Sequence, residues 1–68
     1  MSNLNQIELQ NLKNLIEYNE TSYKKLKEYA SQASDPQIKQ IFKKSAQDAL
    51  NTKQKLISFF EWLNNFII

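Results

Sequence analysis

The chain has 68 residues, nine lysines against seven acidic residues, and no cysteine, histidine, arginine or glycine. One small domain without disulfides is only marginally stable alone, so a partner chain is the remaining source of stability. The missing histidine removes the commonest general base and a common metal ligand, and the missing arginine disfavours nucleic-acid binding. We therefore expect a non-enzymatic protein with no cofactor, no metal and no nucleic-acid partner.

The first half of the chain has the pattern of an amphipathic helix. Asn5 followed by Glu8 has capping-box spacing. After this start, inward-facing positions recur at alternating steps of three and four, the period of a helix packed against other helices. These positions are Leu9, Leu12, Ile16, Asn19, Tyr23, Leu26, Ala30 and Ala33. The pattern predicts a helix over about residues 5–33.

Asp35 and Pro36 divide the chain into two nearly equal halves. A residue before proline is disfavoured in the α region, so the first helix should end near Ser34. Proline fits the first turn of a helix, and Ser34 or Asp35 can cap the helix that follows. The dipeptide therefore predicts the turn of a helical hairpin.

The second half repeats the same alternation. Its seam is predicted as Ile38, Phe42, Ser45, Ala49, Thr52, Leu56, Phe59, Leu63 and Phe66. A helix over about residues 36–66 follows from this pattern. Folding the chain at residues 34–36 sets Asn19 against Thr52 and Tyr23 against Ala49. Asn19, Ser45 and Thr52 should then form a polar layer in an otherwise apolar core.

The apolar surface is wider than one helix–helix groove can cover. Such patches mark interfaces, and two hairpins pairing into a four-helix bundle would bury them. The residues expected at this dimer interface are Ile41, Ile57, Phe60, Trp62 and Ile67. The fold expected for residues 1–68 is therefore a single all-α, antiparallel hairpin domain that dimerises.

Other interpretations of single features carry less weight. Asn19 could bind a ligand, but a polar residue in a seam more often sets the helix register. Glu17 and Glu20 could bind a metal, yet solvated side chains pairing with lysines are the simpler interpretation. The tyrosines could stack on single-stranded nucleic acid, but they lie around the helix and not on one surface.

The C-terminal aromatic cluster could contact a membrane, although its polar face lacks the expected basic residues after Lys55. The segment from Leu56 to Ile68 is too short and too polar to span a bilayer. Residues 1–6 have neither the basic nor the apolar region of a secretory signal. These features predict no membrane span.

The run KKLKEYASQASDPQIKQIF, residues 24–42, resembles the ferritin-like spore coat family related to spore coat protein F. The resemblance extends over roughly residues 9–63 and is most specific from Asp35 to Phe42. It implies two helices per chain that pair into a four-helix, ferritin-like bundle. Relatives with metal sites carry a Glu on the first helix and a Glu-x-x-His on the second. These positions fall on Glu20, Ala49 and Thr52, so the resemblance implies a degenerate member without metal ligands.

The function expected from these features is that of a spore-coat-like structural or assembly protein acting as a homodimeric bundle. Its location would be the cytoplasm or the spore coat, and other coat or regulatory proteins could be further partners. The alternative is a small helical adaptor or regulator that binds another protein through its apolar face.

Overall fold

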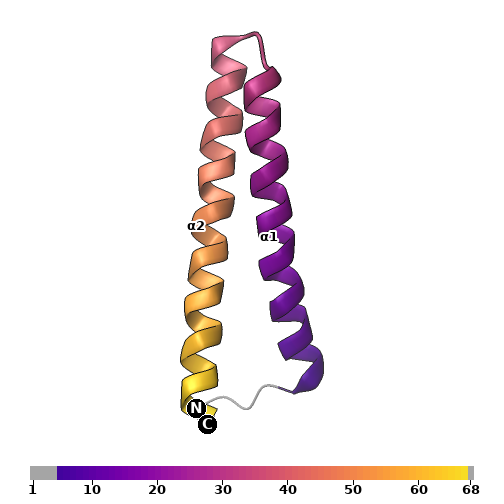
Figure 1. Cartoon of the computed structure of the whole chain (residues 1–68), viewed down its shortest axis with the longest axis vertical. Helices are drawn as coiled ribbons and strands as arrows, with labels where there is room; N and C mark the ends of the chain where they lie inside the picture. The colour runs from indigo at the N-terminus through magenta and orange to yellow at the C-terminus, as the bar shows by residue number, and fades with distance from the viewer. Residues whose placement is uncertain (1–4, 68) are drawn as a thin grey trace.

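The computed structural model describes residues 5–67, with side chains described up to residue 65. It consists of two helices, α1 from Gln6 to Gln32 and α2 from Pro36 to Ile67, packed antiparallel as a hairpin (Figure 1). The hairpin measures 49 × 17 × 14 Å. The predicted all-helical hairpin is confirmed, and the described residues contain no strand.

The start of α1 is fixed by the capping box that the sequence predicts. The Asn5 side chain accepts a hydrogen bond from the Glu8 backbone N–H at 2.8 Å. The Glu8 carboxylate accepts one from the Asn5 N–H at 3.1 Å. Two backbone donors that a helix start leaves unpaired are satisfied in this way.

The connection between the helices needs no glycine. α1 ends at Gln32 and is capped by Ala33, whose backbone is extended (φ −70°, ψ 132°) and whose N–H donates to the Tyr29 carbonyl. Asp35 then caps α2, because its Oδ1 accepts from the N–H groups of Gln37 at 2.7 Å and Ile38 at 3.1 Å. No described residue has a positive φ, the conformation for which glycine is usually chosen at a helix end.

The predicted seam of α1 is confirmed, since all of its residues are buried or half-buried. The seam of α2 differs from its prediction at four places: positions 45, 52 and 59 give way to their neighbours, and Ile38 is exposed. The side chain of Phe66, also predicted in this seam, lies outside the described side chains. The residues that face α1 are Phe42, Ala46, Ala49, Lys53, Leu56, Phe60 and Leu63. Two adjacent rows of α2 have the spacing of a seam. The prediction chose the row through positions 45, 52 and 59, whereas the row through positions 46, 53 and 60 faces α1.

Packing explains why the other row is used. Ala46 is small and lies almost fully buried, so the two helices can approach closely there. Lys53 packs its aliphatic stem in the seam and keeps its ammonium group at the edge. Thr52 and Phe59, one residue earlier, are left exposed.

The hydrophobic core of the described hairpin is thin. It comprises Ala30, Ala46, Ala49 and Leu63, of which only Leu63 is large. Eight large hydrophobic side chains remain exposed. Within residues 5–67, neither helix contains a stretch long and apolar enough to cross a membrane.

Candidate functional site

The hairpin has two broad faces, one on each side of the seam between its helices. On a helix, the residue just before an inward-facing residue and the residue two after it project to the same side of the helix. Because the two helices run antiparallel, this side of α1 and this side of α2 point the same way and together form one face of the hairpin. We call it the charge-poor face, and its uncharged residues include Leu15, Tyr18, Ser22, Tyr29, Ile38, Ile41, Ser45, Thr52, Phe59 and Trp62.

Contacts across the seam agree with this assignment. The rings of Tyr29 on α1 and Phe42 on α2 lie 5.5 Å apart. A shallow groove beside them is lined from both helices, among others by Tyr29, Ala33 and Ile38. The tip of the charge-poor face is therefore continuous across the two helices.

The charge-poor face has apolar ends and a hydroxyl-bearing middle. Near the tip, Ile41 is 58% exposed, and near the middle of α1 Tyr18 is 67% exposed. Phe59 and Trp62 stack at the open end with ring centroids 6.0 Å apart. Ser22, Ser45 and Thr52 lie between these clusters. Three charged side chains, Lys25, Asp48 and Lys55, also lie on this face, each one residue before an inward-facing position.

The structure separates the residues predicted for the dimer interface. Ile41 and Trp62 lie on the charge-poor face, Ile57 is half-buried on the other side of the seam, and Phe60 is half-buried within the seam. The Lys13 ammonium lies 5.8 Å from the centroid of the Phe60 ring. The side chain of Ile67 lies outside the described side chains.

A single hairpin does not assemble the predicted polar layer. Asn19 is half-buried and donates from Nδ2 to the Leu15 carbonyl at 2.9 Å, within its own helix. Ser45 is half-buried and Thr52 is exposed. The polar link between the helices at this level is an ion pair instead, from Lys53 Nζ to Glu20 Oε1 at 2.9 Å.

Glu20 is the charged residue most affected by its neighbours. The hydrogen bond from Lys53 and the charge of that ammonium group lower the pKa of Glu20 below its ordinary value of 4.5. Lys24, 3.6 Å away on the next turn, acts in the same direction. No three acidic side chains among the described residues gather where they could hold a metal ion.

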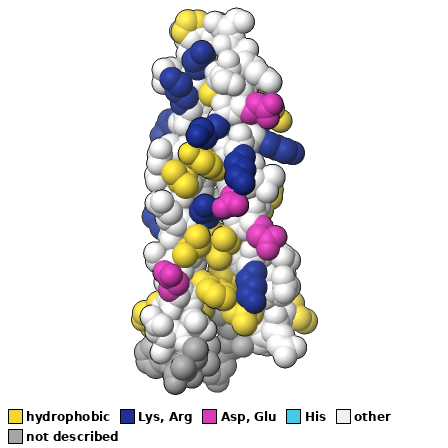
Figure 2. Space-filling model, in the orientation of Figure 1, with side chains coloured by type: hydrophobic (Ala, Val, Ile, Leu, Met, Phe, Trp, Pro, Cys, Tyr) yellow, Lys and Arg dark blue, Asp and Glu magenta, His cyan; other side chains and the backbone are white. Residues whose placement is uncertain are grey.

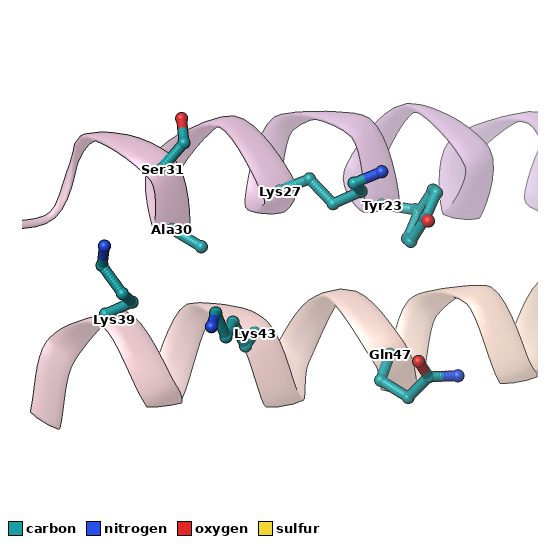
Figure 3. A pocket seen from close by; sticks show the side chains of 7 residues that line it. All are labelled: Tyr23, Lys27, Ala30, Ser31, Lys39, Lys43 and Gln47. Carbon is teal, nitrogen blue, oxygen red and sulfur yellow. The ribbon is translucent and has the colours of Figure 1, made fainter. Parts of the chain in front are cut away.

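On the opposite face, both helices line a groove of about 380 Å³. Its lining residues are Tyr23, Lys27, Ala30, Ser31, Lys39, Lys43 and Gln47 (Figure 3). Figure 2 shows lysine side chains gathered over both helices in the half of the molecule near the connection. Sequence reasoning missed this lysine groove, although Lys39 and Lys43 are spaced to share one side of α2.

Comparison with known proteins adds no further constraint, because no family model, curated protein or solved structure matches the chain. The two faces of the hairpin are therefore the basis for the function proposed next.

Proposed function

We propose that this chain is a non-enzymatic structural or assembly protein that acts as a homodimer, in which two hairpins pair through their charge-poor faces into a four-helix bundle. The observation that carries the proposal is the contrast between a thin core and a wide exposed apolar face. A chain of this size gains much of its stability from any additional apolar area that it buries. In a symmetric dimer each copy buries its own apolar face against the same face of the other copy, so both molecules gain this stability.

The charge-poor face is complementary to itself when the second hairpin runs in the opposite direction. On α2, Ile41 and Trp62 lie at nearly equal distances on either side of Thr52, and so do Asp48 and Lys55. A two-fold axis beside Thr52 therefore sets Ile41 against Trp62 and Asp48 against Lys55 of the second copy. The first pairing is apolar and the second joins opposite charges.

The same axis suits α1. Leu15 and Tyr29 are equally distant from Ser22, so each would meet the other across the interface. Ser22 itself would face Ser22 of the second copy. The hydroxyl-bearing middle of the face then lies at the centre of the dimer and its apolar clusters lie at both ends.

The distribution of charge along the hairpin supports this direction too. Residues 21–51, which form the half near the connection, carry six lysines and three acidic residues. The remaining residues carry three lysines and four acidic residues. An antiparallel dimer places each positive half beside the slightly negative half of the other copy, which favours association.

The resemblance of residues 24–42 to the ferritin-like spore coat family supports an assembly role in a coat structure. The absence of histidine and cysteine from the sequence supports a role without catalysis.

Sedimentation equilibrium of the purified chain tests the proposal. We expect a dimer at micromolar concentration and a melting temperature that rises with protein concentration. The Ile41→Asp variant should shift the protein to monomer, since it buries a charge in the interface. Ile7→Asp is the matched control, because Ile7 is 72% exposed and lies off the charge-poor face.

A wild-type chain that stays a folded monomer at all concentrations would contradict the proposal. That result would favour the adaptor function, in which the charge-poor face binds a different protein. Equal dimerisation of both Asp variants would show that the second copy binds elsewhere on the hairpin.

A further inference from the structure

The lysine groove suggests a binding function that is separate from dimerisation. We propose that it binds a small molecule bearing a diphosphate group. Three of its lining residues are lysines from both helices, Lys27 on α1 with Lys39 and Lys43 on α2, and none is acidic. The groove is therefore a local concentration of positive charge in a chain whose net charge is only +2.

These three lysines have no acidic partner within the described residues. Both ion pairs of that part of the chain use Glu20, with Lys24 and Lys53 as its partners. Glu28, the nearest acidic residue along α1, does not line the groove; its carboxylate accepts instead from Gln32 Nε2 at 3.4 Å. The positive charge of the groove is thus left for an external anion.

The placement of the lysines on α2 raises the local potential further. Lys39 and Lys43 are one turn apart, a spacing at which like charges repel each other. Lys39 is also half-buried and stands in the first turns of α2, near the positive end of the helix dipole. A bound phosphate relieves both unfavourable interactions, and this relief contributes to its affinity.

The shape of the groove favours a diphosphate over a single small anion. In Figure 3, Lys39 lies at the end near the connection, while Tyr23 and Gln47 lie at the other end. The Lys27 ammonium stays over the Tyr23 ring, 5.2 Å from its centroid. The ammonium groups are therefore spread along the groove, and a ligand that meets several of them must carry charge at more than one point.

The remainder of the groove can accept an uncharged organic part. Its volume of about 380 Å³ lies in the range of small-molecule sites. The Tyr23 phenol and the Gln47 amide offer hydrogen-bonding groups and an aromatic surface at the end away from Lys39. The ligand class is accordingly inorganic pyrophosphate or an organic diphosphate, with the diphosphate group as the shared recognised part.

Titrations followed by amide and lysine side-chain NMR test this proposal. Inorganic pyrophosphate and a nucleoside 5′-diphosphate are the two probes, each added at constant ionic strength so that general screening does not change. We expect saturable shifts centred on the groove. Tighter binding of the nucleoside diphosphate assigns the Tyr23 end to an organic group, and equal affinity assigns recognition to the diphosphate alone.

A pair of double variants separates a built site from general charge attraction. Lys39→Gln with Lys43→Gln should weaken pyrophosphate binding at least about tenfold, the effect of losing two charge-assisted contacts. Lys24→Gln with Lys44→Gln removes the same charge outside the groove and should change the affinity less than about twofold. Equal losses in both variants, or shifts that never saturate, would overturn the proposal.

The outcome does not depend on the dimer. The groove lies on the face opposite the charge-poor face, so the Ile41→Asp monomer should keep its affinity for pyrophosphate. Loss of binding in that variant while it stays helical would contradict the separation of the two sites.

Discussion

Glu20 and Lys53 join the two helices of the hairpin near their middle, with 2.9 Å between the carboxylate Oε1 and the ammonium Nζ. Lys53 occupies an inward-facing position of α2, and only 21% of its side chain is exposed. The pair links residues 33 positions apart in the sequence and so depends on the register of the hairpin.

This ion pair predicts a pH-dependent contribution to stability. Because the pKa of Glu20 is lowered in the folded chain, its contribution is fully present above pH 4.5 and is lost as the pH falls through the lowered pKa. Glu20→Gln should therefore lower the melting temperature at pH 7 and make little difference in strong acid. Thermal melts by circular dichroism at several pH values measure this difference.

The control for that experiment is Glu17→Gln. Glu17 is exposed and forms no ion pair within the described residues, so its replacement should leave the melting temperature at pH 7 nearly unchanged. An equal effect of the two substitutions would mean that net charge, and not the contact with Lys53, is responsible.

Asp35 is predicted to stabilise the connection between the helices. Its replacement by Ala removes the acceptor for two backbone N–H groups and should lower the free energy of unfolding by about 1 kcal/mol. Asp35→Asn keeps a good capping side chain and should retain most of the stability. Urea unfolding at a fixed protein concentration compares the three chains, and equal losses in Ala and Asn would assign the effect to charge alone.

Asn19 is predicted to reduce the stability of the hairpin. Its side chain is half-buried, and its hydrogen bond to the Leu15 carbonyl lies within one helix, where such bonds add little. Asn19→Leu should raise the free energy of unfolding by about 1 kcal/mol through added apolar burial. Asn14→Leu, at an exposed position, is the control and should change it by less than about 0.5 kcal/mol. A marked loss in Asn19→Leu would reveal a required polar role.

The direction of the two hairpins in the proposed dimer can be tested by cross-linking. The chain has no cysteine, so Thr52→Cys introduces the only thiol. In an antiparallel dimer, Thr52 lies beside the two-fold axis, and mild oxidation should yield a disulfide-linked dimer. In a parallel dimer Thr52 faces Ser22 instead, and the cross-link should not form.

The control for cross-linking is Gln54→Cys, which is exposed on the side of α2 away from the charge-poor face. It should stay monomeric on a non-reducing gel under the same oxidation. Comparable cross-linking of Gln54→Cys would indicate random collisions rather than a defined interface.

Much of the fold could be predicted from short-range signals. The capping box at Asn5 and the Asp35–Pro36 junction depend on neighbouring residues, and both are present in the structure as predicted. The seam of α1 was also predictable, because its neighbouring row contains lysines, glutamates and amides that cannot replace it.

The seam of α2 was not predictable in the same way. Thr52 and Lys53 compete for one inward position, and the polarity of the two side chains favours Thr52. The structure places Lys53 there because Glu20, on the other helix, stands at the matching level. The lysine groove was missed for the same reason: it depends on contacts between the helices, because Lys27 lies beside Lys39 and Lys43 only after the chain folds.

Pro36 also decides the length of the molecule. Both halves of the chain carry heptad-like patterns, and without an interruption they could continue as one helical rod of about 90 Å. A proline inside such a rod would clash with the preceding turn and remove a hydrogen bond, at a cost of about 3 kcal/mol or more. Pro36 therefore favours the compact hairpin over one continuous helix, because its ring is incompatible with an uninterrupted helix through the connection.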